Sequence, residues 1–185
     1  MKKTLTLVAA LLAIASQAAS IDWSMTGTAA VTGSNGDPLS GATLYLISAK
    51  DTSWTTKDYT SKQAFLDALA EVTINNAYAL DDDGKKPTIE NVVVTSDLMG
   101  TTSMTFGLMV LEQTSTGGYN FKLTTVTATP YATGATADAH TVLKTNISKL
   151  ASGTSAPWTA ASVPEPSTAA LALAGLALLL KRRKA

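Results

Sequence analysis

Cysteine is absent from all 185 residues, and histidine occurs only once, as His140. A chain without cysteine has no disulfide bonds and no thiolate nucleophile. A metal centre built on two or three histidines of one chain is excluded as well. We therefore expect a domain whose stability rests on its hydrophobic core.

Positive charge is scarce in the middle of the chain. The 14 Lys and Arg residues balance the 14 Asp and Glu residues, but six of the cations stand at positions 2, 3, 181, 182, 183 and 184. Residues 21–162 therefore contain 8 cations and 13 acids. A mildly acidic domain lacks the basic face that nucleic-acid binding requires, so we expect no nucleic-acid partner.

No apolar run reaches the roughly 20 residues that span a bilayer as a helix. The first run, Leu5 to Ile14, follows a pair of lysines and precedes several small residues. This order is typical of a secretory signal peptide, so residues 1–20 are predicted to be removed by signal peptidase. Cleavage after Ala18 and cleavage after Ser20 fit equally well. A permanent N-terminal anchor is disfavoured because the run is only about ten residues long.

The last 23 residues, 163–185, combine three features in a fixed order. A Pro-Glu-Pro triplet comes first, and an apolar run from Thr168 to Leu180 follows it. As a helix this run would be about 20 Å long, against roughly 30 Å of bilayer hydrocarbon. Four consecutive cations follow the apolar run, and because cations stay on the cytoplasmic side we expect a membrane helix at about 168–180 with the domain outside. The cations are Lys181, Arg182, Arg183 and Lys184.

The triplet Pro164, Glu165 and Pro166, with the apolar run and basic end, resembles the PEP-CTERM sorting signal of Gram-negative bacteria. The resemblance implies that a membrane-embedded exosortase cuts near the triplet and passes the protein to the cell surface. It also implies a link to extracellular polysaccharide, which such proteins often accompany. Prolines lack backbone donors and keep the preceding residues extended, which suits an accessible substrate. The alternative is a plain C-terminal anchor that is never cut.

Threonine occupies 29 positions, and β-branched side chains favour strands over helices. Apolar or alternating stretches between turn formers predict a series of strands, and we expect the first two to pair as a hairpin. The pattern indicates an all-β, β-sandwich-like domain over residues 21–162. The predicted strands cover 21–32, 42–48, 72–80, 89–96, 102–113, the stretch after 119, 139–147 and the end of 151–162.

The clearest hairpin joins 102–113 to a strand that begins at Tyr119, with its turn at Gly117-Gly118. In the returning strand the apolar positions change parity, which predicts a bulge near Thr124 or Thr125.

One short amphipathic helix is predicted near 61–70. Thr60 to Gln63 has the pattern of a capping box, and apolar residues then recur at helical spacing. The predicted core consists of Leu44, Leu46, Phe65, Leu69, Val93, Met104, Phe106, Leu108, Val110, Phe121 and Leu123.

An acidic turn is the best candidate for a ligand site. Aligned with a calcium-binding loop, Asp81 and Asp83 take the third and fifth positions and Glu90 takes the twelfth. The first position is Ala79, which has no carboxylate, and two lysines follow the acids. We therefore expect a solvated hairpin tip, and a domain that folds without metal or cofactor.

The sequence contains only weak signals of a catalytic site. Asp138 and His140 would share one face of a strand, but no Gly-x-Ser-x-Gly elbow supplies a nucleophile. Glu71, Glu90 and Glu112 could supply a carboxylate pair for glycoside hydrolysis, yet nothing sets their separation.

Aromatic side chains could instead form a platform for sugar rings. Trp54 stands in a polar run, so it is expected to be more exposed than Trp23 or Trp158. Together these features predict an exported, surface-directed protein without enzymatic activity, associated with the cell envelope or an extracellular polysaccharide matrix. The alternative is a carbohydrate-binding module, and a hydrolase comes third. We expect an inner-membrane anchor until processing, and a cell-surface or extracellular location afterwards.

Overall fold

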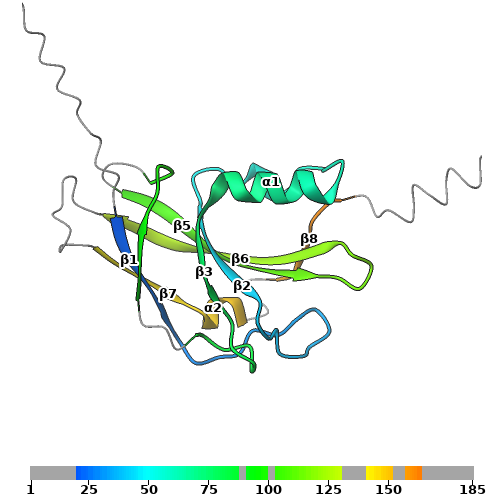
Figure 1. The fold of residues 1–185 in the computed structure, drawn as a ribbon, viewed down its shortest axis with the longest axis horizontal. Helices are drawn as coiled ribbons and strands as arrows, with labels where there is room; N and C mark the ends of the chain where they lie inside the picture. The colour runs from blue at the N-terminus through cyan, green and yellow to red at the C-terminus, as the bar shows by residue number, and fades with distance from the viewer. Residues whose placement is uncertain (1–19, 88–90, 100–102, 131–140, 152–156, 164–185) are drawn as a thin grey trace, which may run out of the picture.

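The computed structural model describes residues 20–87, 91–99, 103–130, 141–151 and 157–163, which form two β-sheets, one helix of three turns and two shorter helices (Figure 1). The smaller sheet has the order β4 (Asn91–Thr95), β1 (Ser20–Thr26), β7 (Thr141–Asn146). The larger sheet has the order β3 (Thr73–Ala79), β2 (Thr43–Ser48), β5 (Ser103–Gln113), β6 (Tyr119–Pro130), β8 (Thr159–Ala160). The predicted β-rich, sandwich-like class is confirmed at this level.

The predicted hairpin between the first two strands is wrong. β1 pairs antiparallel with β4 and parallel with β7, whereas β2 lies between β3 and β5 in the other sheet. The turn formers between β1 and β2 reverse the chain, but the reversal carries it from one sheet to the other. The acidic turn after β3 makes the same kind of crossing, so it is not a hairpin tip either.

The two sheets pack face to face around the larger of two hydrophobic clusters. Trp23 of β1 and Tyr78 of β3 meet edge to face, with ring centroids 4.6 Å apart. Their polar atoms are paired, because the Trp23 Nε1–H donates to Thr145 Oγ1 (2.9 Å) and the Tyr78 hydroxyl donates to the Trp23 carbonyl (2.8 Å). Burial raises the pKa of Tyr78.

Helix α1 (Lys62–Val72) covers the opposite face of the larger sheet (Figure 1). Its Phe65 and Leu69 are buried in a second cluster with Ile47, Met109 and Phe121 of the sheet. Consequently, β5 has both faces covered, and residues 106–110 are buried without interruption. The sandwich thus has a third layer, which the helix provides.

The start of α1 differs by one residue from the predicted capping box. Ser61, not Thr60, is the N-cap, and its hydroxyl accepts from the Ala64 N–H at 3.1 Å. Gln63 donates instead to Asp67, one turn along, at 2.7 Å. The helix also extends two residues beyond the predicted end at 70. Two shorter helices, η1 (Ser53–Thr55) and α2 (Ser148–Ala151), were not predicted.

Most of the predicted core is buried, but Val93 is 59% exposed and its neighbour Val94 is buried in its place. Met104 and Leu123 are only half-buried. Three consecutive valines at 92–94 give no parity signal, so the sequence could not show which of them faces inward.

The bulge in the β5–β6 hairpin is also displaced from its predicted position. The register is regular at Thr124 and Thr125 and shifts between Met104 and Phe106, opposite residues 126–129. The apolar residues of β6 switch from odd-numbered to even-numbered positions because both faces of this strand are covered. Phe121 packs on the helix side, and Val126 packs on the cluster between the sheets. The hairpin turn is as predicted, with Gly117 at φ +84°.

No helix among the described residues is long and apolar enough to cross a membrane. The run at about 168–180, predicted to be a membrane helix, lies outside the described residues. The same holds for residues 1–19 of the predicted signal peptide.

Candidate functional site

Trp54 is not the exposed platform that its polar neighbours suggested. Only 6% of it is exposed, and its ring packs against Phe65 (centroids 6.2 Å apart) and Phe121 (5.6 Å). Trp54 and its polar neighbours form the short helix η1. In this helix the indole points toward the protein interior and packs against the second cluster. Its carbonyl accepts from the Tyr59 hydroxyl at 2.7 Å. Because Trp54 is buried, it cannot serve as the exposed aromatic platform for sugar rings that the sequence suggested.

The acidic turn is held by its own backbone. Asp81 Oδ1 accepts from the N–H groups of Asp83 (3.0 Å) and Lys85 (2.6 Å), and the Lys85 ammonium pairs with Asp83 Oδ2 at 3.0 Å. The hydrogen bond and charge of Asp83 raise the pKa of Lys85. The described residues contain no group of three or more potential metal ligands. Glu90 lies outside the described residues, so the calcium alignment stays untested.

The other candidate residues are not brought together by the described structure. Asp138 and His140 lie outside the described residues. Glu71 is an exposed residue of α1. Glu112 of β5 uses both carboxylate oxygens to accept from the Ser34 N–H, at 3.0 and 3.2 Å, which ties the loop after β1 to the sheet.

Residues 157–163, here called the exit segment, form the last described part of the chain. The sequence predicted a strand that runs into a linker, but the segment is attached along its length. β8 pairs with β6, Ala161 N–H donates to the Tyr119 carbonyl (2.8 Å), and Tyr59 N–H donates to the Ser162 carbonyl (2.8 Å). The Ser162 hydroxyl also donates to Asp58 Oδ1 at 2.5 Å. The chain is therefore held to the domain up to the residue before Pro164.

Apolar contacts attach the exit segment to both hydrophobic clusters. Trp158 packs against the cluster between the sheets, and Ala161 and Val163 pack against the cluster under α1. The Trp158 Nε1–H donates to the Thr32 carbonyl at 3.2 Å. The one signal of this docking in the sequence was a tryptophan in a stretch of small residues.

Lys122 lies beneath Trp158 and is unusually buried for a lysine, with 4% of it exposed. Its ammonium lies 5.1 Å from the centroid of the Trp158 ring and donates to the Leu150 carbonyl, at the end of α2, at 3.1 Å. Burial lowers the pKa of Lys122, and the charge of Glu112 opposes this shift. The side chain thus joins three segments: β6, α2 and the exit segment.

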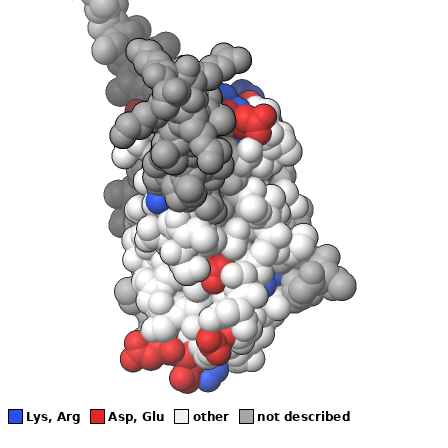
Figure 2. Space-filling model, turned by 90° about the vertical axis from the view of Figure 1, so that its right-hand side faces the viewer, with Lys and Arg blue, Asp and Glu red and all other residues white. Residues whose placement is uncertain are grey.

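Charged side chains are sparse on the side of the molecule seen in Figure 2. Uncharged residues make up most of the described surface in this view, with an acidic side chain near its centre, another group of acidic atoms at the upper right, and several acidic side chains at the lower end. A surface with so few charged side chains offers little electrostatic attraction for a strongly charged ligand.

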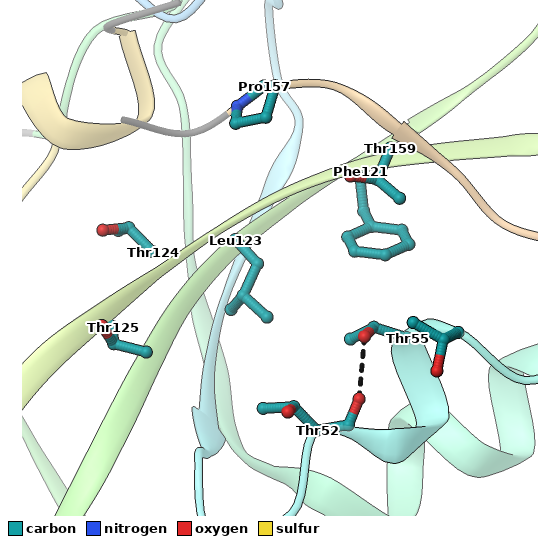
Figure 3. A pocket seen from close by; sticks show the side chains of 9 residues that line it. Thr52, Thr55, Phe121, Leu123, Thr124, Thr125, Pro157 and Thr159 are labelled. Atoms are coloured by element: carbon teal, nitrogen blue, oxygen red, sulfur yellow. Dashed lines mark hydrogen bonds between the residues drawn. The ribbon is translucent and has the colours of Figure 1, made fainter. Parts of the chain in front are cut away.

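A hollow of about 450 Å³ opens between the exit segment, β6 and the turn around η1. Figure 3 shows Phe121 and Leu123 pointing from β6 toward the turn that carries Thr52 and Thr55. The Thr55 hydroxyl donates to the Thr52 carbonyl at 2.8 Å, which leaves its oxygen lone pairs as acceptors. Six of the nine lining residues are threonines and none is charged; the nine are Thr52, Thr55, Thr56, Phe121, Leu123, Thr124, Thr125, Pro157 and Thr159.

Comparison with known protein families gives a match at the end of the chain. Residues 162–184 match the model of the PEP-CTERM protein-sorting motif. The chain carries a PEP-CTERM sorting signal. The motif indicates an exported protein that is a substrate of an exosortase-type enzyme, and it includes the triplet Pro164, Glu165 and Pro166 that the sequence singled out. Neither the curated proteins nor the solved structures contain a match to this chain.

Proposed function

We propose that this chain is a non-enzymatic display protein, exported after removal of its N-terminal signal peptide, folded outside the inner membrane, and released by an exosortase-type enzyme. The basic end, Lys181 to Lys184, holds the tail in the membrane until the cut. The released domain then resides at the cell surface or in the extracellular polysaccharide matrix. The observation that carries this proposal is the position of the motif, which overlaps the last two residues of the docked exit segment and continues beyond it.

Processing can be tested by changing the prolines of the triplet. Pro164→Ala together with Pro166→Ala restores two backbone N–H groups and frees the preceding residues from extended geometry. We expect this variant to stay in the membrane fraction at full length, whereas the wild type is shortened at its C-terminus. Pro157→Ala is the matched control, because Pro157 lies in the exit segment but outside the motif. Equal shortening of all three proteins, by mass spectrometry, would contradict the proposal.

A second candidate function is binding of a neutral polysaccharide in the hollow beside the exit segment. Threonine hydroxyls can donate and accept hydrogen bonds, their methyl groups and Leu123 are apolar, and the absence of charge in the lining suits an uncharged sugar chain. The test is binding of the cell's own extracellular polysaccharide to Thr55→Val/Thr125→Val, a nearly isosteric change. Thr95→Val on β4 of the smaller sheet is the control. Equal retention of wild type, variant and control would dismiss this site.

A further inference from the structure

The exit segment already uses the backbone groups that a peptide-cutting enzyme would need on the N-terminal side of the Pro-Glu-Pro triplet. Enzymes and domains that grip an extended peptide commonly pair with its backbone as an added strand. Ala161 N–H and the Ser162 carbonyl are engaged with Tyr119 and Tyr59. Before an enzyme could pair with these residues, the segment would have to leave the sheet.

Leaving the sheet would disrupt more than the two-residue strand β8. Trp158 would lose its contact with the cluster between the sheets and its hydrogen bond to Thr32, and Lys122 would lose the ring above it. Val163 would leave the cluster under α1. Buried contacts therefore hold the segment near its start, at Trp158, and at its end, at Val163, so undocking from either end breaks such contacts.

We infer that the exosortase-type enzyme cuts this chain while the exit segment stays docked, reading only residues C-terminal to Ser162. This inference rests on the proposed function. In the cut, one peptide C–N bond breaks, the carbonyl carbon bonds to the oxygen or nitrogen of an incoming hydroxyl or amine, and the leaving amine takes up the proton.

The docked segment also limits how far the folded domain stands from the membrane. Five peptide units join Val163 to Thr168, where the apolar run begins, and they span at most about 18 Å. The enzyme therefore meets the face of the domain that carries the start of α1. After the cut, the new C-terminus stays beside this face instead of on a free tether.

A cross-strand disulfide can lock the segment for a test. Because Ala161 donates to Tyr119, those two residues form a hydrogen-bonded pair, and the adjacent pair Asn120 and Ala160 is non-hydrogen-bonded. Cα atoms in such a pair are about 4.5 Å apart, within the range that a disulfide bridges. The chain has no other cysteine, so Asn120→Cys/Ala160→Cys forms a unique cross-link in the oxidising space outside the inner membrane.

The experiment compares full-length wild type, the locked double variant and both single cysteine variants in cells that contain the sorting enzyme. We expect the locked protein to be processed within about twofold of the wild-type rate and at the same peptide bond, by intact mass, with the disulfide formed. A loss of tenfold or more that reductant reverses, and that neither single variant shows, would overturn the inference but not the proposed function. An unprocessed wild type would overturn both.

Trp158→Ala provides an independent arm that needs no disulfide. It removes the anchor of the exit segment, so the segment should undock more often. If processing occurs in the docked state, the variant should be cut no faster than the wild type. A tenfold faster cut would show that undocking limits the reaction, and it would overturn the inference even if the double variant failed to cross-link.

Discussion

The indole N–H of Trp54 has no hydrogen-bond partner among the described residues, whereas that of Trp23 donates to Thr145. Both rings are buried, so a change to phenylalanine removes similar apolar area from each. Trp54→Phe loses no hydrogen bond, but Trp23→Phe does. We therefore expect Trp23→Phe to destabilise the fold by about 1 kcal/mol more than Trp54→Phe. Urea unfolding of a soluble chain spanning 20–163 measures the difference, and equal losses would contradict this assignment of the two indoles.

Burial of Lys122 has a consequence for the pH dependence of stability. Its pKa in the folded state lies below the ordinary value of 10.5, mainly because of burial. Between these two values the unfolded chain binds more protons than the folded chain, so the contribution of Lys122 to stability rises with pH. Relative to Lys122→Met, which does not titrate, the wild type should gain stability as pH rises toward 10.5.

The measurement is urea unfolding of both proteins at a series of pH values between 7 and 10.5. Tyr45, Tyr59 and Tyr78 have raised pKa values and titrate in both proteins, so their effects cancel in the difference. A difference that stays flat, or that falls with pH, would show that the Lys122 ammonium is not desolvated in the fold.

At the scale of elements, the position of β1 favours one of the two predicted signal-peptide cuts that the sequence left open. Ser20 pairs with Thr95 as the first residue of β1, and Ile21 is fully buried. A cut after Ser20 would remove that residue from the strand and place a charged amino group on Ile21, which is costly beside a buried side chain. We therefore expect a cut after Ala18, which leaves Ala19 as the first residue of the exported protein, and intact mass checks it.

Two substitutions separate the possible cuts. Ser16→Leu fills the small-residue position three residues before the bond after Ala18, so it should block cleavage there. Ser20→Val fills the position before the other bond and suits a strand, so it should leave processing unchanged. An exported chain that begins at Ile21 would rule out the role given to β1.

At the scale of the whole molecule, strands from the beginning and the end of the domain pair with each other in the smaller sheet. β1 pairs in parallel with β7, more than a hundred residues later in the chain, and the Trp23–Thr145 hydrogen bond spans 122 positions. Such non-local contacts form late, because loop closure must precede them. The smaller sheet therefore cannot be completed until β7, near the end of the domain, is available to pair with β1.

The exit segment also stabilises the fold through long-range contacts, because it packs against both hydrophobic clusters. A soluble chain that ends after Pro157 lacks Trp158, β8 and Val163, and should be less stable than one that ends after Val163 by roughly 2–5 kcal/mol. Chemical unfolding of the two chains gives the difference. A loss below about 1 kcal/mol would mean that the segment rests on the surface without supporting the fold.

Local sequence determined the main strands, the helix α1 and the sorting motif of this protein. Strand positions, the Gly117-Gly118 turn and the helix near 61–70 follow from periodicity and turn chemistry that act over a few residues. The sorting motif at 162–184 is equally local, since an enzyme reads it along the chain. These features needed no knowledge of what packs against them.

Only the tertiary structure decided which surfaces are covered and which strands are neighbours. Alternation shows that a strand has an apolar face, but it does not name the element that buries it. Trp54 is buried because α1 lies on the larger sheet, and Val93 is exposed because β4 turns Val94 inward. The exit segment is docked because Trp158 and Val163 reach two clusters assembled from distant residues. Burial depends on long-range contacts, and no local pattern in this chain encodes them.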